Sequence, residues 1–157
     1  MKISNIYIAG SFADPRDRLE LEKLVQNVRL QLHKNGGDYV NVYVPMEHKI
    51  EEDFQKPDGT WNLPNHIWGK KVFDMDMEHL YNADMVIAMY TGTNGTSWEM
   101  GFAYAKGIPV YIYVPEYAKS KDMSLMVLNG SYGYLADPEE ILFETNKEEL
   151  FKQLNQK

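Results

Sequence analysis

The chain has 157 residues, 44% of them apolar, and a formal net charge of −7 at pH 7; we expect residues 1–157 to form one domain with a buried core. The acidic balance argues against binding to nucleic-acid backbones or membranes, although backbone amides could still hold a small anion. The sequence has no cysteine, no signal-peptide pattern and no apolar run near the roughly 18 residues of a membrane span, so we expect a cytoplasmic protein without disulfides or thiolate metal sites.

Apolar runs with strand character alternate with segments of helical spacing. In chain order we predict a strand at 3–10, a helix from Pro15 to Gly36 capped by Asp14, a strand at 40–44, a long loop at 46–65, a helix at 66–82, a strand at 85–90, a turn at 91–95, a helix at 96–106 ended by Gly107, a strand at 108–114, a loop at 116–122, a short apolar piece at 123–128, a fifth strand at 132–135 and a closing helix at 148–154. This alternation predicts an α/β domain with a parallel sheet. Ligands bind such sheets at the carboxyl ends of the strands, where the turns at 10–11, 91–95 and 115–122 should lie.

Glu99 follows a polar turn at the head of an otherwise apolar helix, and two interpretations of it stay open. The segment from Thr96 to Glu99 fits a capping box, with Thr96 as N-cap and Glu99 at the third helical position. Alternatively, Glu99 lies at the ligand edge one turn before Ala103 and faces inward as a nucleophile. In that case the helix N-terminus would favour its ionised form.

Asp76 belongs to the apolar stripe formed by Val72 and Leu80, whereas Asp74 and Glu78 point elsewhere. An inward aspartate could simply accept a hydrogen bond from a backbone group. Two inward carboxylates in different surroundings are also what glycosidic-bond chemistry requires. One attacks the anomeric carbon and the other handles the proton of the leaving group.

Several motifs, in their order and approximate spacing, resemble those of the nucleoside 2-deoxyribosyltransferases. They are Tyr7 in the first strand, PMEH at 45–48, Trp68, DMEHL at 76–80 followed by Ala83 and Asp84, GTSWEMG at 95–101, and LM at 125–126. The resemblance extends from about Ile6 to about Met126. It implies a flavodoxin-like three-layer α/β sandwich with a central, mostly parallel five-stranded sheet.

The resemblance implies transfer of 2-deoxyribose between bases with retention of configuration. Glu99 would attack C1′ as the base departs, and a second base would attack the covalent intermediate. Asp76 would shuttle the proton, Tyr7 would orient Glu99 by a hydrogen bond, and Trp68 would help to wall the base pocket. From the residues alone, Tyr7 could instead be a core aromatic, and Trp68 and Met126 could be plain packing.

The resemblance also implies substrate contacts, a homo-oligomer and no cofactor. The expected substrate-binding residues are Gly10, Ser11, Phe12, His48, Trp68, Thr93, Gly95, Ser124 and Met126. Members are homo-oligomers, so we expect a dimer-based assembly, with a hexamer as one option, in which Met126 of a neighbouring subunit completes each site. Neither a metal nor an organic cofactor is implied, and the four histidines lack metal-ligand spacing.

Two positions depart from the family pattern. Thr93 stands where the transferases usually carry aspartate, and Ser124 stands where they usually carry asparagine. Hydroxyls at these positions are similar to those of the related 2′-deoxynucleoside 5′-monophosphate N-hydrolases, and Gly10, Ser11 and Arg16 resemble the phosphate-binding first loop of that branch. Hydroxyls can donate to phosphate, whereas a carboxylate would repel it. Transferase, nucleotide hydrolase and non-catalytic nucleotide-binding module therefore stay open, as does neutral replacement at the two positions.

Overall fold

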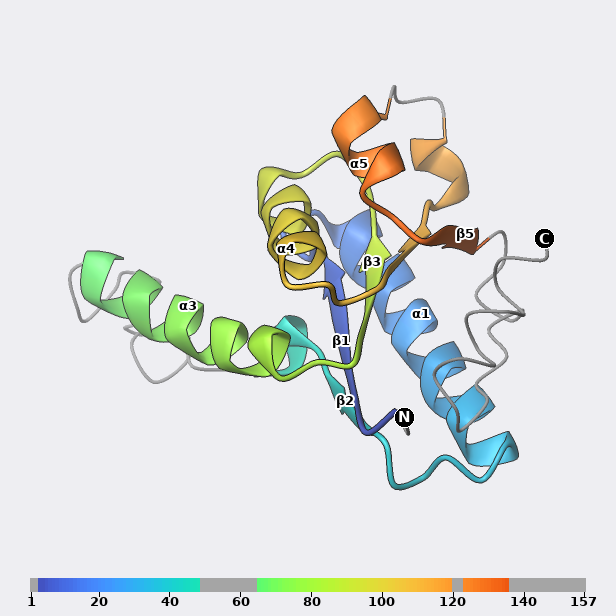
Figure 1. Cartoon of the computed structure of the whole chain (residues 1–157). Helices are drawn as coiled ribbons and strands as arrows, with labels where there is room; N and C mark the ends of the chain where they lie inside the picture. Colours follow the sequence, from blue (N-terminus) through green and yellow to red (C-terminus); the bar gives the residue numbers. More distant parts are fainter. Residues whose placement is uncertain (1–2, 49–64, 120–122, 136–157) are drawn as a thin grey trace.

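The computed structural model describes residues 3–48, 65–119 and 123–135, with only the backbone described at 65–68 and 134. These residues form one five-stranded sheet of order β2-β1-β3-β4-β5 (Figure 1). All four strand pairings are parallel. The strands are β1 (Asn5–Gly10), β2 (Asn41–Tyr43), β3 (Met85–Met89), β4 (Val110–Tyr113) and β5 (Gly133–Leu135). The predicted α/β fold with a parallel sheet is confirmed, and the strand order is that of flavodoxin-like folds.

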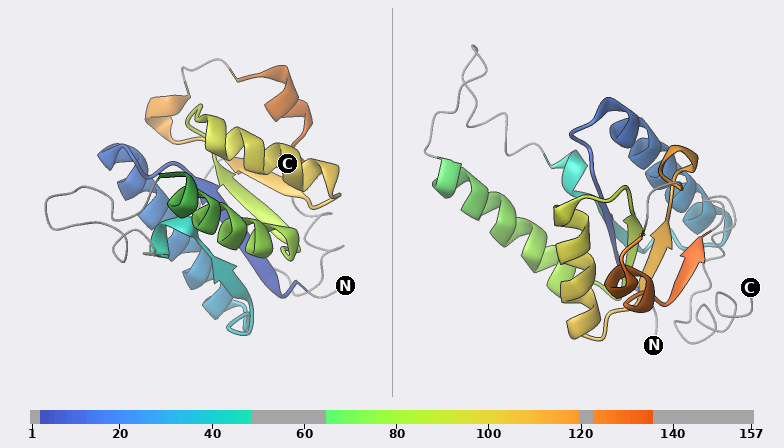
Figure 2. Two further views of the ribbon diagram at one scale, coloured as in Figure 1. Left: turned by 90° about the vertical axis from the view of Figure 1, so that its left-hand side faces the viewer. Right: turned by 90° about the horizontal axis from the view of Figure 1, so that it is seen from above.

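Helices cover both faces of the sheet. They are α1 (Pro15–Lys34), α3 (Asn65–Tyr81), α4 (Asn94–Ala105) and α5 (Leu125–Asn129), with short 3₁₀ turns η1 (Pro45–Glu47) and η2 (Glu116–Ala118). Helix α1 lies on one face, and α3 and α4 lie on the other, with α5 beside α4 (Figure 2). The result is the three-layer sandwich expected from the family resemblance.

Helix α1 follows directly from local sequence signals. The Asp14 side chain caps it by accepting a hydrogen bond from the Arg16 amide at 2.7 Å, and Pro15 occupies the first helical position. Its buried stripe consists of Leu21, Leu24, Val25, Val28 and Leu32, together with the charged Asp17. Gly36 follows the helix at φ +70°, a conformation that favours glycine.

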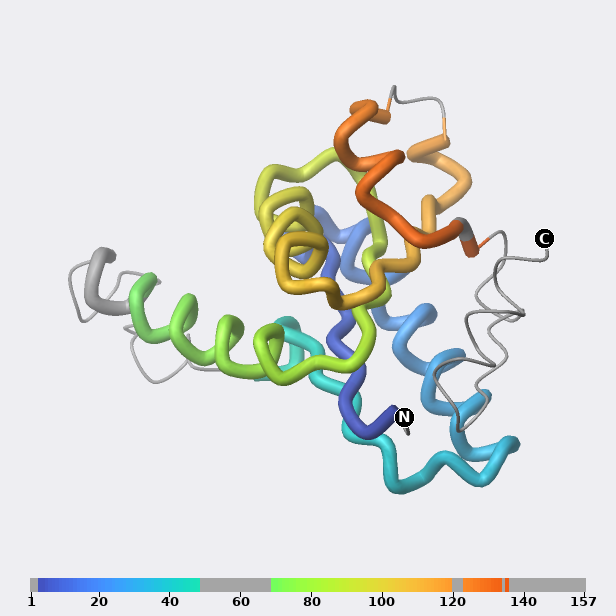
Figure 3. Tube along the Cα trace, in the orientation of Figure 1, coloured from blue at the N-terminus to red at the C-terminus, as the bar shows by residue number. Residues whose placement is uncertain are grey.

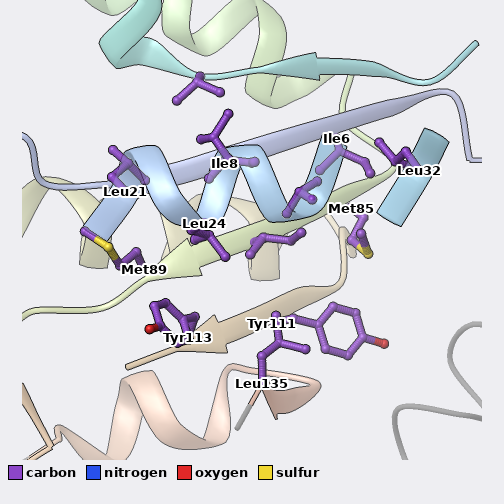
Figure 4. Close-up of a cluster of buried hydrophobic side chains, with 14 of the residues drawn as sticks. Ile6, Ile8, Leu21, Leu24, Leu32, Met85, Met89, Tyr111, Tyr113 and Leu135 are labelled. Carbon is purple, nitrogen blue, oxygen red and sulfur yellow. The ribbon is translucent and has the colours of Figure 1, made fainter. Parts of the chain in front are cut away.

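Two cores lie on opposite faces of the sheet because side chains alternate along each strand. Ile6 and Ile8 belong to the cluster that packs against α1, which Figure 4 shows with Met85, Met89 and Tyr111. The other cluster contains Tyr7 and Ala9 of β1, Tyr43 of β2, Leu80 of α3, and Met100 and Ala103 of α4. The alternation therefore directs the Tyr7 side chain toward α3 and α4.

The strand order reverses between β1 and β3, which makes their carboxyl ends the topological switch point. The loop after β1 and the turn at 91–93 after β3 lie at this edge, and η2 follows β4 at the same edge. The expected placement of the polar turns is thus confirmed for their described residues. Within the described ranges, no helix combines the length and apolar character needed to cross a membrane.

Element boundaries differ modestly from those predicted. The strands are shorter by one to a few residues at their ends, and the predicted loop at 46–65 begins with η1. Beyond the sheet, α3 extends away from the body of the molecule (Figure 3). Residues 49–64 and the predicted closing helix at 148–154 lie outside the described residues.

Candidate active site

Helix α4 begins at Asn94, with Thr93 as its extended N-cap residue. The capping-box prediction, with Thr96 as N-cap, is therefore wrong. Thr96 lies in the first turn, where its buried hydroxyl accepts a hydrogen bond from that of Thr93 at 3.0 Å, and Ser97 Oγ donates to the Thr93 carbonyl at 3.0 Å. Glu99 is consequently the sixth helical residue, and its carboxyl is not part of the cap.

The carboxyl of Glu99 instead contacts β1. The hydroxyl of the fully buried Tyr7 donates a hydrogen bond to Glu99 Oε1 at 2.6 Å. The pKa of Glu99 is raised to about 7 as the net result of three effects: burial, the largest, raises it, the hydrogen bond from Tyr7 lowers it, and the charge of Asp76 raises it. The expectation that the helix N-terminus favours the ionised form of this carboxyl stays a prediction. The dipole acts mainly over the first turn of a helix, and Glu99 lies in the second turn of α4.

The carboxyl of Asp76, on α3, likewise accepts a hydrogen bond from a tyrosine, in this case one on β2. The hydroxyl of the buried Tyr43 donates to Asp76 Oδ1 at 2.7 Å, so the partner of this carboxyl is a side chain. Burial raises the pKa of Asp76, whereas the hydrogen bond from Tyr43 and the charges of His48 and His79 lower it.

Four rings join the two carboxyl groups. Tyr7 and Tyr43 are paired residues on neighbouring strands, and their rings stack with centroids 5.5 Å apart. The imidazoles of His48 and His79 stack on Tyr43 at 4.3 Å and 3.7 Å. The sequence reasoning missed Tyr43 and His79. The available signals were that Tyr43 ends a strand beside that of Tyr7 and that His79 follows Asp76 by three residues on one helix.

The loop after β1 packs toward α1. A Cβ at Gly10 would lie 2.8 Å from Leu21 Cδ1 and 3.2 Å from Met89 Cβ, so glycine allows the close packing of α1 on the sheet. Phe12 packs against the same core, and its carbonyl accepts a hydrogen bond from Arg18 Nε at 3.2 Å. Ser11 is half-buried in this loop.

A second cluster missed by the sequence reasoning joins three segments at the ligand edge: the start of α1, the turn after β3 and η2. Asp17, which is 8% exposed, accepts hydrogen bonds from Thr91 Oγ1 at 3.0 Å and from the Tyr117 hydroxyl at 2.6 Å. The Arg16 guanidinium lies over the Tyr117 ring, 5.2 Å from its centroid. These contacts link the segments that follow β1, β3 and β4.

Ser124 and Met126 lie on the far side of α4 from Glu99. Ser124 caps α5 by accepting from the Met126 amide at 3.2 Å, and Met126 is 83% exposed. Both line a groove of about 530 Å³ between α4 and α5, whose lining also includes Ser97, Gly101 and Tyr104. The last three residues share one face of α4, roughly half a turn away from Glu99. The structure therefore does not bring Ser124 and Met126 to Glu99 of the same chain.

The remaining residues expected to bind substrate differ in their exposure and in what they contact. His48 is exposed and reaches the tyrosine stack, Thr93 is half-buried, and Gly95 is exposed in the first turn of α4. The side chain of Trp68 lies outside the described residues. An aromatic surface not anticipated from sequence joins α3 to α4, with the ring of Phe73 edge-on to that of Trp98 at 5.6 Å.

A family model described as nucleoside 2-deoxyribosyltransferase matches residues 6–154. The chain belongs to this family. The match extends well beyond the motif region noted in the sequence, which ended near Met126. A search of curated protein sequences found no match.

Two solved structures share the fold of this nucleoside 2-deoxyribosyltransferase family member. A 2-deoxyribosyltransferase from Bacillus psychrosaccharolyticus is 23% identical with a TM-score of 0.67, covering 94% of this chain and 96% of its own. A conserved protein from Enterococcus faecalis V583 is 20% identical with a TM-score of 0.57, covering 98% of each chain. A CMP N-glycosidase from Clostridium botulinum also matches over 98% of each chain, at 16% identity and a TM-score of 0.48.

Proposed function

We propose that the protein is a nucleoside 2-deoxyribosyltransferase that moves 2-deoxyribose between purine or pyrimidine bases, with a role in nucleotide salvage in the cytoplasm. The observation that carries this proposal is the pair of carboxyl groups of Glu99 and Asp76, each of which accepts a hydrogen bond from the hydroxyl of a buried tyrosine. The two come from different helices and have different surroundings, as a donor–acceptor pair in glycosidic chemistry requires. Family membership supports the same assignment.

Glu99 is the nucleophile in this proposal. Tyr7 holds Oε1, which leaves Oε2 to form a bond to C1′ of the deoxyribose. The C1′–N bond breaks as that bond forms, and its electron pair goes to the departing base. A second base then attacks C1′ and releases the carboxylate, so two displacements retain the configuration.

Asp76 is the proton shuttle. Its raised pKa favours holding a proton in a partly buried site, and donation of that proton would let the base leave as a neutral molecule. The incoming base would return a proton to the same carboxyl. Because Glu99 must be ionised to attack and its pKa lies near 7, activity should increase as the pH rises through this value.

Assembly completes the site in this proposal. Met126 and Leu125 are 83% and 75% exposed, and Ser124 and Met126 lie away from Glu99 of their own chain. A homo-oligomer would let them serve the site of a neighbour. Mixing subunits of Glu99→Gln with subunits carrying Ser124→Ala and Met126→Ala should then restore activity that neither preparation has alone. Mixtures no more active than the sum of the two would contradict shared sites.

The activity test is a chromatographic assay of the purified protein with deoxyinosine and with its 5′-monophosphate, each with and without free adenine. The proposal expects deoxyadenosine from the nucleoside only when adenine is present. The control is Glu99→Gln, which should form no product and still bind the donor. Binding without turnover by the unaltered protein would instead indicate the non-catalytic nucleotide-binding module.

A second candidate function is hydrolysis of 2′-deoxynucleoside 5′-monophosphates. The observation that favours it is the neutral Thr93 at the cap of α4, close in sequence to Glu99, where a hydroxyl rather than a carboxylate would face the sugar. Release of hypoxanthine from the monophosphate alone, unaffected by adenine, would support this candidate over the transferase.

A further inference from the structure

Tyr7 and Tyr43 form a matched pair on neighbouring strands. They are register partners, both side chains lie on the α3/α4 face of the sheet, and each hydroxyl donates to a carboxyl of a different helix. The sequence motifs point to Tyr7 as the partner of Glu99 and say nothing of Tyr43. From this duplicated geometry we propose that Tyr43 is the positioning residue of Asp76, orienting its carboxyl as Tyr7 orients that of Glu99. This inference rests on the proposed function for its catalytic consequence.

The ring of Tyr43 is held from several directions. Tyr43 is 4% exposed, it packs against the Tyr7 ring, and the imidazoles of His48 and His79 stack on it. His79 is itself fixed, because its Nδ1 lies 3.0 Å from the carbonyl oxygen of Met75. A ring confined in this way has little freedom to redirect its hydroxyl, which therefore provides a fixed donor for Asp76.

Helix α3 supplies both the stacking group and the carboxyl. His79 and Asp76 are three residues apart and so lie on adjacent positions of one helix face. The contact of His79 with the Tyr43 ring thus sets the approach of α3 to β2, and the same contact places Asp76 at the hydroxyl. With Oδ1 occupied by Tyr43, Oδ2 is the oxygen that can exchange a proton with the base.

The titration of Asp76 should report this interaction. The groups facing the Tyr43–Asp76 pair are His79 from α3, His48 after η1, Tyr7 from β1 and Glu99 from α4. A donated hydrogen bond stabilises the ionised carboxyl. Removing only the Tyr43 hydroxyl should therefore raise the pKa of Asp76, while the ring contacts remain.

The test compares Tyr43→Phe with Tyr111→Phe, a matched control that removes a buried hydroxyl on the α1 face of the sheet. The Asp76 carboxyl is followed by ¹³C NMR in protein labelled at aspartate Cγ, with its signal assigned by Asp76→Asn. We expect Tyr43→Phe to raise the Asp76 pKa by about 1 unit and Tyr111→Phe to leave it unchanged. An unchanged Asp76 titration in Tyr43→Phe would overturn the proposal.

Kinetics provide the catalytic readout. Tyr43→Phe should lower kcat by roughly tenfold or more with little change in KM, and the loss should grow for donors whose bases are poorer leaving groups. A loss independent of the leaving group would overturn the positioning role. If the unaltered protein cleaves no N-glycoside, the proposed function fails, while the NMR titration still decides whether Tyr43 positions Asp76.

A second measurement keeps Tyr43 in place and so tests the proposal even if Tyr43→Phe does not fold. The Tyr43 hydroxyl proton should be visible by NMR as a slowly exchanging downfield signal, and Asp76→Ala should speed its exchange. Equal exchange rates in the two proteins would contradict the hydrogen bond and with it the proposal.

Discussion

The hydroxyl of Tyr7 lies 2.6 Å from Oε1 of Glu99, although 92 positions of sequence separate the two residues. The contact joins the middle of β1 to the second turn of α4. It places a hydrogen-bond donor against a carboxyl whose pKa is raised to about 7, mainly by burial. A buried donor of this kind stabilises the ionised carboxyl that attack on C1′ requires.

Tyr7→Phe should shift the pH dependence of the reaction upward. The change keeps the ring and removes the donor that lowers the pKa of Glu99. The acidic limb of the kcat/KM profile, which reports ionisation of Glu99 in the free enzyme, should move by about 1 unit to higher pH. Tyr111→Phe is the matched control, and an equal shift in both variants would contradict the assignment.

Asp76→Asn should move the acidic limb of the kcat/KM profile to lower pH, because the charge of Asp76 raises the pKa of Glu99. The variant also loses the proton donor, so we expect kcat to fall by about 10²–10⁴-fold with ordinary base donors. Donors whose leaving groups depart readily as anions should recover most of that rate. Equal losses for good and poor leaving groups would argue against Asp76 as the proton shuttle.

Glu99→Gln should remove a pH dependence of stability. The folded pKa of about 7 exceeds the ordinary value of 4.5 for a glutamate carboxyl, so the stability from the protonated carboxyl is fully present below about 4.5 and lost as the pH rises through 7. Thermal unfolding should show Glu99→Gln close to the unaltered protein at pH 5 and more stable at pH 8, by about 1–3 kcal/mol. Glu22→Gln, an exposed change on α1, should show no such difference.

Gly10→Ala should destabilise the fold by about 1–3 kcal/mol, because the new methyl group would overpack the contact of α1 with the sheet. The second change Leu21→Val shortens the side chain whose Cδ1 lies nearest. In a double-mutant cycle, monitored by denaturant unfolding, the combined cost should be smaller than the sum of the two single costs. Strict additivity would show that the cost at Gly10 has another origin.

Local signals predicted much of the fold. The Asp14–Pro15 start of α1 and the positive φ of Gly107 after α4 depend on neighbouring residues, and both are present. The start of α4 could not be predicted in the same way. Thr93 and Thr96 are equally good caps by residue type, and the hydrogen bond between their hydroxyls together with the burial of Thr96 places Thr93 at the cap.

The candidate site was only partly predictable, because it depends on contacts between residues that are far apart in the sequence. Helical spacing identified Asp76 as an inward residue, but its partner Tyr43 lies 33 positions away on another element. Nothing in the local pattern of β2 specifies that contact. The pKa of Glu99 likewise depends on burial by the assembled fold and on Tyr7 and Asp76, which lie on other elements.

The central claim is that Glu99 forms a covalent bond to the sugar. The most direct test is mass spectrometry of the intact protein quenched during turnover of a deoxynucleoside, followed by peptide mapping. We predict an added mass of one deoxyribosyl group on the peptide containing Glu99, absent from Glu99→Gln. Turnover without an adduct, together with full activity of Glu99→Gln, or an adduct on a different residue, would contradict the account.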